Sequence, residues 1–105
     1  MNRGDVWDAD VPGGRRPVVV LTRNEAIPLL RRVTVAPITS TIRGLPSEVR
    51  VGEAEGLDHD SAVSCDNIVT LPQARLDRRR GALGPDAVRA LDAAIIIALG
   101  IDAAR

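Results

Sequence analysis

Short runs of alternating or β-branched apolar residues recur along the chain and predict a protein built mainly of β-strands. From Val6 to Val11, apolar residues alternate with Asp8 and Asp10, which is typical of a half-buried strand with its carboxylates on the polar face. Pro17 to Thr22 is a β-branched run that predicts a central strand. Further strands are predicted at residues 33–39, 48–51, 61–64 and 67–71.

Turn-forming residues separate these strands. The predicted breaks are Pro12-Gly13-Gly14, the connection 23–32 with Pro28, the turn at Gly44 and Pro46, the acidic stretch 53–60 and one helical turn at 72–76. The arginine run 78–80 leads to a short extended piece. We interpret that run as a solvated linker, with contact to phosphates as the alternative.

The last segment predicts a helix. Pro85 suits the first helical position, Leu83 before it can pack on Val88, and Gly100 can end the helix. Apolar residues recur at helical spacing at Val88, Leu91, Ile95 and Leu99. Ile96 and Ile97 widen the apolar surface beyond one stripe, so we expect this helix to pack on its own sheet and on a second subunit. Dimerisation is predicted from the surplus apolar surface at Ile95, Ile96 and Ile97.

A chain of 105 residues is expected to form one domain, because two domains would each be too small for a core. The strand pattern predicts a five- or six-stranded, strongly bent antiparallel sheet with one C-terminal helix. This is a mainly β fold, close to an SH3-like barrel.

Composition limits the chemistry that the chain can offer. Trp7 is the only aromatic residue, so contact with RNA cannot depend on rows of stacked aromatic side chains. Acidic and basic residues balance at 14 each, which argues against a strongly basic nucleic-acid surface. Every basic residue is arginine, whose planar fork can bind phosphate through two hydrogen bonds.

Cysteine and hydropathy patterns indicate a cytoplasmic protein. Cys65 is the only cysteine, which excludes an internal disulfide and a cysteine-based zinc site. The first residues lack the apolar run of a signal peptide. The longest apolar run, Ala93 to Leu99, is too short to span a bilayer.

His59 is the only histidine, which removes the pair of histidines that commonly serves metal-free RNA cleavage. We interpret it as a solvated loop residue, with a catalytic role as the alternative. A metal site at Asp58, His59 and Asp60 is disfavoured because adjacent residues point in different directions. We therefore expect no metal and no cofactor.

The residue pair Arg15-Arg16 follows two glycines and precedes a β-rich strand, so Arg16 is expected at a rigid strand edge. A fixed guanidinium suits the negative charge of a phosphodiester transition state, although a solvated pair beside a turn is the alternative. Hydroxyl groups at residues 39–41 could bind a phosphate or cap the loop. Asp66 could orient an arginine or accept hydrogen bonds from backbone amides.

Four segments, taken in order, resemble the MazF/PemK family of toxins. They are Arg3-Gly4-Asp5-Val6-Trp7, Arg16-Pro17-Val18-Val19-Val20-Leu21, Val35-Ala36-Pro37-Ile38-Thr39-Ser40 and Val63-Ser64-Cys65-Asp66-Asn67-Ile68-Val69-Thr70. With the apolar terminal helix, the resemblance spans nearly the whole chain.

The resemblance implies a homodimeric toxin of a type II toxin–antitoxin system that cleaves single-stranded mRNA, tRNA or rRNA without a metal. The 2′-hydroxyl would attack the adjacent phosphate and leave 2′,3′-cyclic phosphate and 5′-hydroxyl ends. By position, Arg16 would stabilise the pentavalent phosphate and is a candidate for proton transfer, and Thr39 would hydrogen-bond a phosphate oxygen. The further candidates for RNA contact are Arg15, Ser40, Thr41, Arg23, Asp66 and Trp7.

The chain departs from the family pattern in two places. Some members carry a catalytic arginine where this chain has Ser64, so a second arginine would come from Arg15 or Arg23 or be absent. The first loop, between Val11 and Arg16, is shorter than is usual in the family.

Two other functions remain possible on the sequence alone. A gyrase-poisoning family shares this barrel and binds a protein, and a degenerate SH3-like interaction domain would have lost activity. For the ribonuclease, a neutral protein with an arginine-lined groove suits an acidic, partly disordered antitoxin segment.

Overall fold

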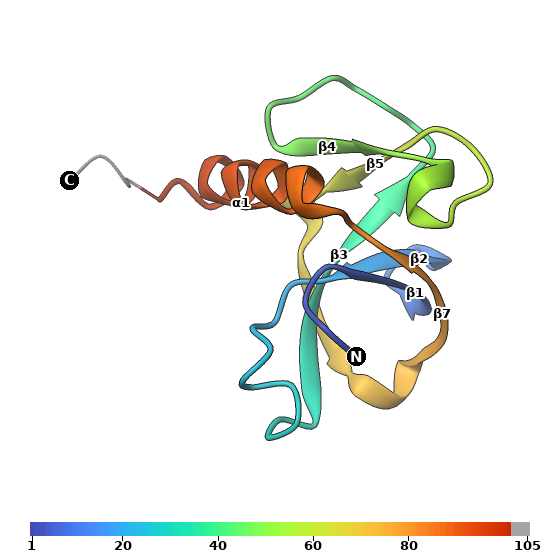
Figure 1. Cartoon of the computed structure of the whole chain (residues 1–105), viewed down its shortest axis with the longest axis vertical. Helices are drawn as coiled ribbons and strands as arrows, with labels where there is room; N and C mark the ends of the chain where they lie inside the picture. The colour runs from blue at the N-terminus through green and yellow to red at the C-terminus, as the bar shows by residue number, and fades with distance from the viewer. Residues whose placement is uncertain (102–105) are drawn as a thin grey trace.

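The computed structural model describes residues 1–101, in which a curved antiparallel sheet packs against one helix (Figure 1). The strands are β1 (Asp5–Val11), β2 (Gly14–Val20), β3 (Arg32–Thr39), β4 (Glu48–Val51), β5 (Ser61–Ser64), β6 (Val69–Pro72) and β7 (Leu76–Ala82). The helices are the single 3-10 turns η1 (Glu53–Glu55), η2 (Cys65–Asn67) and η3 (Gln73–Arg75) and the α-helix α1 (Pro85–Leu99). The prediction of a mainly β fold with a C-terminal helix is confirmed; residues 102–105 of the predicted domain lie outside the described residues.

Strand β3 organises the sheet. The strand order is β4-β5-β3-β2-β1-β7, and β6 also pairs with β3. The first half of β3 pairs with β6, from Arg32 to Val35, and its last two residues, Ile38 and Thr39, pair with β5. The segment that joins β5 to β6, which contains η2, therefore lies beside the middle of β3.

The predicted central strand is confirmed as β2, whose last three residues are buried on both faces. Val19 packs into the apolar cluster beneath α1, whereas Val18 and Val20 pack into a second cluster on the other side of the sheet. Because successive side chains of a strand point to opposite faces, a run without polar positions indicates a strand covered on both sides. All three valines are fully buried.

Helix α1 has the ends that the sequence predicts. Pro85 is its first residue, and Gly100 adopts a left-handed conformation at its end, with φ of 68°. Leu91 and Ala94 are buried against the sheet, and α1 runs alongside β4 and β5 (Figure 1). Ile96 and Ile97 remain exposed on the outer side of α1.

Two expectations about polar residues are wrong. The arginine run 78–80 is not a linker but lies within β7, a seventh strand paired with β1. Asp8 is not solvated, since it is only 8% exposed and pairs with Arg80 at 3.3 Å. Both errors have one cause: β7 covers the edge of β1, and its arginines neutralise the carboxylates of that strand.

No helix within residues 1–101 is both long enough and apolar enough to cross a membrane.

The buried thiol of Cys65 gives a test of the fold. Its burial, together with the charge of Asp66, raises the pKa of the thiol to about 11, and the residue is 1% exposed. We expect iodoacetamide to modify Cys65 at pH 8 at least about a hundredfold more slowly in the native protein than in denaturant, since the thiolate is the nucleophile. Equal rates in both states would contradict this packing.

Candidate active site

Two adjoining clefts open at the end of the sheet where β2 begins and β3 ends. The first has a volume of about 610 Å³ and the second of about 450 Å³. Three residues line both clefts, namely Arg16, Thr39 and Thr41. The predicted catalytic pair, Arg16 and Thr39, thus lies where the two clefts meet.

The strand register brings this pair together. Val18 of β2 lies opposite Pro37 of β3, and the same antiparallel register continued by two residues places Arg16 opposite Thr39. Pairs directly across an antiparallel ladder have their side chains on the same face. The two residues are 23 positions apart in the sequence, and only this pairing makes them neighbours.

Arg16 is positioned but not neutralised. Its Nε is buried without a hydrogen-bond partner, and its Nη2 makes only a long contact, 3.5 Å, with the carbonyl oxygen of Gly13. Within residues 1–101 no carboxylate lies within ion-pair distance of its guanidinium. A buried donor without a partner costs about 1–3 kcal/mol, and the terminal nitrogens of Arg16 remain without a carboxylate that an anionic ligand in the cleft would have to displace.

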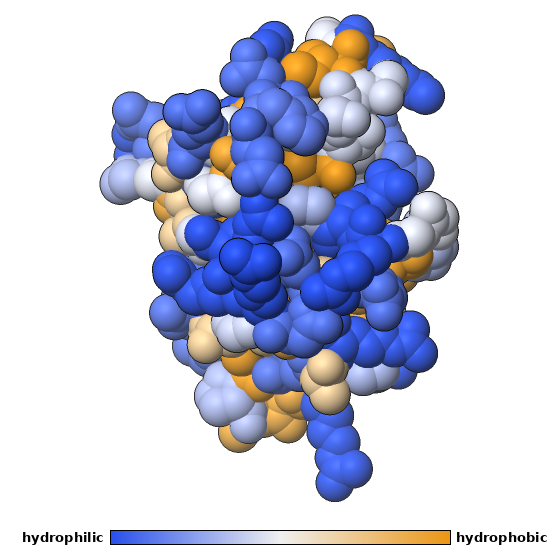
Figure 2. Space-filling model, turned by 90° about the vertical axis from the view of Figure 1, so that its right-hand side faces the viewer, coloured by the Kyte–Doolittle hydropathy of each residue, from blue (hydrophilic) through white to orange (hydrophobic). Residues whose placement is uncertain are grey.

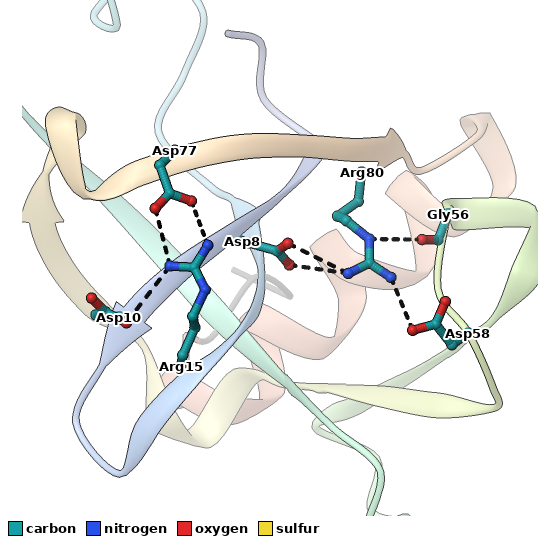
Figure 3. A network of polar contacts seen from close by, with 7 residues as sticks. All are labelled: Asp8, Asp10, Arg15, Gly56, Asp58, Asp77 and Arg80. Carbon is teal, nitrogen blue, oxygen red and sulfur yellow. Dashed lines mark hydrogen bonds and ion pairs between the residues drawn. The ribbon is translucent and has the colours of Figure 1, made fainter.

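Arg15 differs from its neighbour because carboxylates already hold it (Figure 3). Both terminal nitrogens of its guanidinium donate to Asp77, at 2.7 and 3.0 Å, and Asp10 lies 3.7 Å away. The hydrogen bond with Asp77 raises the pKa of Arg15 and lowers that of the Asp77 carboxyl. Of the two arginines that flank the turn, Arg16 is therefore the one left for an anionic ligand.

The hydroxyl of Thr39 is held as an acceptor. Its Oγ1 accepts a hydrogen bond from the backbone N–H of Thr41 at 3.1 Å, so its own proton remains available to a ligand. Ser40 is exposed and lines the second cleft. The three hydroxyl residues predicted from the sequence are therefore all present at the clefts.

The segment between β3 and β4 carries a cation that the sequence argument missed. Arg43 lines the first cleft and is exposed, and among the described residues it forms no ion pair. Oε1 of Glu48 accepts hydrogen bonds from the backbone N–H groups of residues 43–45 at distances between 2.9 and 3.3 Å. A glycine turn directly after an arginine was the only signal in the sequence, and such turns are common.

Asp66 is also at the first cleft, from η2. Its Oδ2 accepts a short hydrogen bond, 2.6 Å, from the hydroxyl of Ser47, which ties η2 to the segment before β4. Ser64 lines the same cleft and accepts a hydrogen bond from the side-chain amide of Asn67 at 2.8 Å. The family arginine position occupied by Ser64 thus faces the cleft, and Arg43 supplies a positive charge there.

Two predicted RNA-contact residues lie away from the clefts. Trp7 packs, partly buried, into the second apolar cluster, and its Nε1 is buried without a partner within the described part of the chain. Arg23 is exposed in the connection beyond the opposite end of β2. Neither lines the first or the second cleft.

His59 lies in the wall of the second cleft, next to Asp58. Within residues 1–101, no three histidine, cysteine or carboxylate side chains are grouped so that they could hold a metal ion. The chemistry available at the junction of the clefts is therefore that of a fixed guanidinium, hydroxyl donors and further cations.

Comparison with known proteins shows the family of the chain. The sequence model of the PemK-like, MazF-like toxins of type II toxin–antitoxin systems matches residues 2–99. Endoribonuclease MazF3 of Mycobacterium tuberculosis is 48% identical over 87 residues, which cover 83% of this chain and 84% of that protein.

Two solved structures are also similar. The M. tuberculosis toxin MazF-mt6 has a TM-score of 0.88 and 44% identity, and the match covers 93% of this chain and 98% of that one. An endoribonuclease from a mycobacterial species, solved with its cognate antitoxin, has a TM-score of 0.87 and 28% identity over 96% of each chain.

The fold and these matches place the chain in the class of small, mainly β toxins. The chain belongs to the PemK-like, MazF-like toxin family of type II toxin–antitoxin systems. The endoribonuclease names of its relatives favour RNA cleavage over a gyrase-binding toxin or a degenerate interaction domain.

Removal of the Glu48 carboxylate gives a test of the first cleft. In Glu48→Ala three backbone N–H groups lose their acceptor, so hydrogen exchange of residues 43–45 should accelerate about tenfold or more. Glu48→Gln keeps one acceptor oxygen and should show a smaller change. Glu25→Ala, an exposed carboxylate in another loop, is the control; unchanged exchange in Glu48→Ala would disprove this role.

Proposed function

We propose that this toxin cleaves single-stranded RNA where its two clefts meet, without a metal, and that Arg16 and Thr39 are its catalytic residues. The observation that carries the proposal is the Arg16 guanidinium, which has no carboxylate partner within residues 1–101 and lines both clefts together with Thr39. Endoribonuclease activity is the activity of the family to which the chain belongs.

In the proposed reaction the ribose 2′-hydroxyl attacks the adjacent phosphorus. The 2′-oxygen gives up its proton and bonds to phosphorus, while the bond to the 5′-oxygen breaks and that oxygen takes up a proton. The products are a 2′,3′-cyclic phosphate and a 5′-hydroxyl end, and the reaction consumes no water and needs no metal ion. Negative charge gathers on the non-bridging oxygens, which is where a preorganised guanidinium lowers the barrier.

The proposal gives each residue a different part. Arg16 lines both clefts and has no carboxylate partner within residues 1–101, so its guanidinium can donate to a phosphate oxygen without first leaving a carboxylate. Thr39, whose oxygen is occupied by the Thr41 amide, can donate its hydroxyl proton to a second oxygen. Arg43 adds a positive charge for a neighbouring phosphate in the first cleft.

An unpaired strand is the substrate that fits these clefts. Attack in line with the leaving oxygen requires a nucleotide that can rotate about its backbone, and a duplex restrains that rotation. Affinity would come from guanidinium and hydroxyl groups, because the only aromatic residue packs in the core.

An antitoxin protein is the second proposed partner. One similar mycobacterial endoribonuclease was solved with its cognate antitoxin. For this chain we propose an acidic, partly disordered segment that folds over the clefts and satisfies Arg16 and Arg43 with carboxylates. The place of action would be the cytoplasm, where its RNA substrates are found.

A homodimer is proposed from the apolar residues that the fold leaves uncovered. Ile95 packs inward on the core beneath α1, so it is not part of this surface. The exposed apolar side chains at the end of α1 are Ile96, Ile97, Leu99 and Ile101. Their contiguity on one helix end suits burial against a second copy of the chain.

The two arginines beside the first turn provide the main test of activity. We expect Arg16→Ala to lower kcat by about 100- to 1000-fold, the usual effect of removing one preorganised donor. Arg15→Ala removes a side chain that is bound to Asp77 and should change kcat by less than about fivefold, as expected for an exposed ion pair.

The measurement is cleavage of a mixed RNA in EDTA, with the new ends mapped and circular dichroism as a check on folding. Cuts with 5′-hydroxyl ends that are lost in Arg16→Ala would support the site. Full activity in a folded Arg16→Ala protein would remove it. If the folded wild-type protein does not cleave RNA, gyrase supercoiling would be assayed next.

A charged substitution on α1 tests the proposed homodimer. Ile97→Glu places a carboxylate on the exposed apolar end of the helix and should shift sedimentation at micromolar concentration from dimer to monomer. Leu29→Glu makes the same change at a leucine that is 82% exposed in another loop and should leave the dimer intact. A monomeric wild-type protein would contradict the proposal.

A further inference from the structure

The second cleft contains groups that the proposed reaction does not use. Its far wall comes from the segment between η1 and β5 and includes Asp58, His59 and Ser61. Its near wall is Arg16 and Thr39, which it shares with the first cleft. A strand of RNA with its cleaved phosphate on this pair would therefore place one flanking nucleotide in each cleft.

The second cleft differs from the first in its charge. Besides Arg16 it contains two arginines, and both already have carboxylate partners (Figure 3). Arg15 is held by Asp77, and Arg80 lies 3.3 Å from Asp8 and 3.4 Å from Asp58. A phosphate in this cleft would have to compete with those carboxylates, whereas the first cleft offers the unpaired Arg43.

Hydrogen-bonding groups of neutral or acidic character remain available in the second cleft. Asp58 is 86% exposed at its side chain and turns only Oδ2 toward Arg80. His59 and Ser40 add a ring nitrogen and a hydroxyl. Carboxylate, imidazole and hydroxyl groups match the amino and imino hydrogens of a base edge and the hydroxyls of a ribose, rather than a phosphate.

Arg80 fixes the wall that carries these groups. Its side chain is only 17% exposed, and its Nε donates to the carbonyl oxygen of Gly56 at 3.1 Å. Nη1 contacts both oxygens of the buried Asp8, and Nη2 contacts Asp58, so one guanidinium joins β1, β7 and the wall (Figure 3).

The backbone also holds the wall against β7. A Cβ on Gly56 would lie 2.1 Å from the carbonyl oxygen of Arg80, and one on Gly81 would lie 2.4 Å from that of Glu55. Both positions must be glycine for the two backbone segments to approach so closely. This side of the molecule, on the right in Figure 1, is largely hydrophilic (Figure 2).

We propose that the second cleft is a nucleoside subsite, which binds the base and ribose of one nucleotide beside the cleaved phosphate. Asp58 and His59 contact the base edge, and Arg80 is a positioning residue that sets their place. The proposal rests on the RNA-cleaving function and adds a determinant of sequence preference to it.

The test is the base preference around the cut, read by sequencing the ends of a randomised RNA cleaved in EDTA. Asp58→Asn and His59→Ala should each reduce discrimination between bases about tenfold or more at one position beside the cut. Preferences at the other positions should be unchanged. Asp60→Asn is the matched control, since this exposed carboxylate belongs to the same segment but does not line the cleft.

Arg80→Lys tests the positioning role while it keeps a positive charge beside the buried Asp8. Lysine has no fork to reach Gly56 and Asp58 together, so preference should weaken at the same position as in Asp58→Asn. We expect KM to rise with kcat within about threefold of the wild type. A lower melting temperature alone, with the preference unchanged, would mean that Arg80 is only structural.

The outcomes separate this proposal from the function on which it rests. Wild-type rates and an unchanged preference profile in Asp58→Asn and His59→Ala would overturn the subsite and leave the ribonuclease intact. No cleavage by the folded wild-type protein would overturn both.

Discussion

The antiparallel register between β2 and β3 is the constraint on which the site depends. Arg16 and Thr39 are opposite each other only because Val18 lies across from Pro37. A slip of one residue would turn every side chain of β2 to the other face, and Val19 would exchange clusters with its neighbours. That slip would also bring Pro17 or Leu21, which are only partly buried, into a position that a fully buried valine now holds. The core therefore fixes the site through packing rather than through polar contacts, and the proposed catalytic pair itself needs no mutual hydrogen bond.

Carboxylate pairing divides the arginines of this chain into two groups. Arg15 and Arg80 are held by aspartates and join β1, β2, β7 and the η1–β5 segment. Arg16 and Arg43 have no such partner within residues 1–101 and line the first cleft. A formal net charge of zero is thus compatible with a local positive field at the cleft. Counting charges over the whole sequence hides this division, because pairing is decided by neighbours in space.

The short turn between β1 and β2 changes how the clefts are bounded. Val11 pairs with Gly14, so only Pro12 and Gly13 connect the two strands, and Gly13 has a φ of 94°. The turn is short, but Val11 and Pro12 still line the first cleft. Two longer segments complete the walls: residues 40–47, tied down by Glu48 and Asp66, and residues 56–61, tied down by Arg80. Each wall is held by charge-assisted hydrogen bonds to the backbone or to a neighbouring strand, which keeps the clefts formed while they stand open to a ligand.

The sequence by itself determined six of the seven strands, the helix and the fold class, because apolar periodicity, prolines and glycines act locally; the limits of β4 and β5 and both ends of α1 agree with it. It also singled out Arg16 and Thr39, through a resemblance that preserves their order along the chain. Only the tertiary structure distinguished Arg16 from Arg15, turned the 78–80 run into a strand, and placed Arg43 at the first cleft and Arg23 far from it. Those outcomes depend on which residues, carboxylates above all, become neighbours on adjacent strands and loops. Such contacts join residues up to 89 positions apart, and no local pattern specifies them.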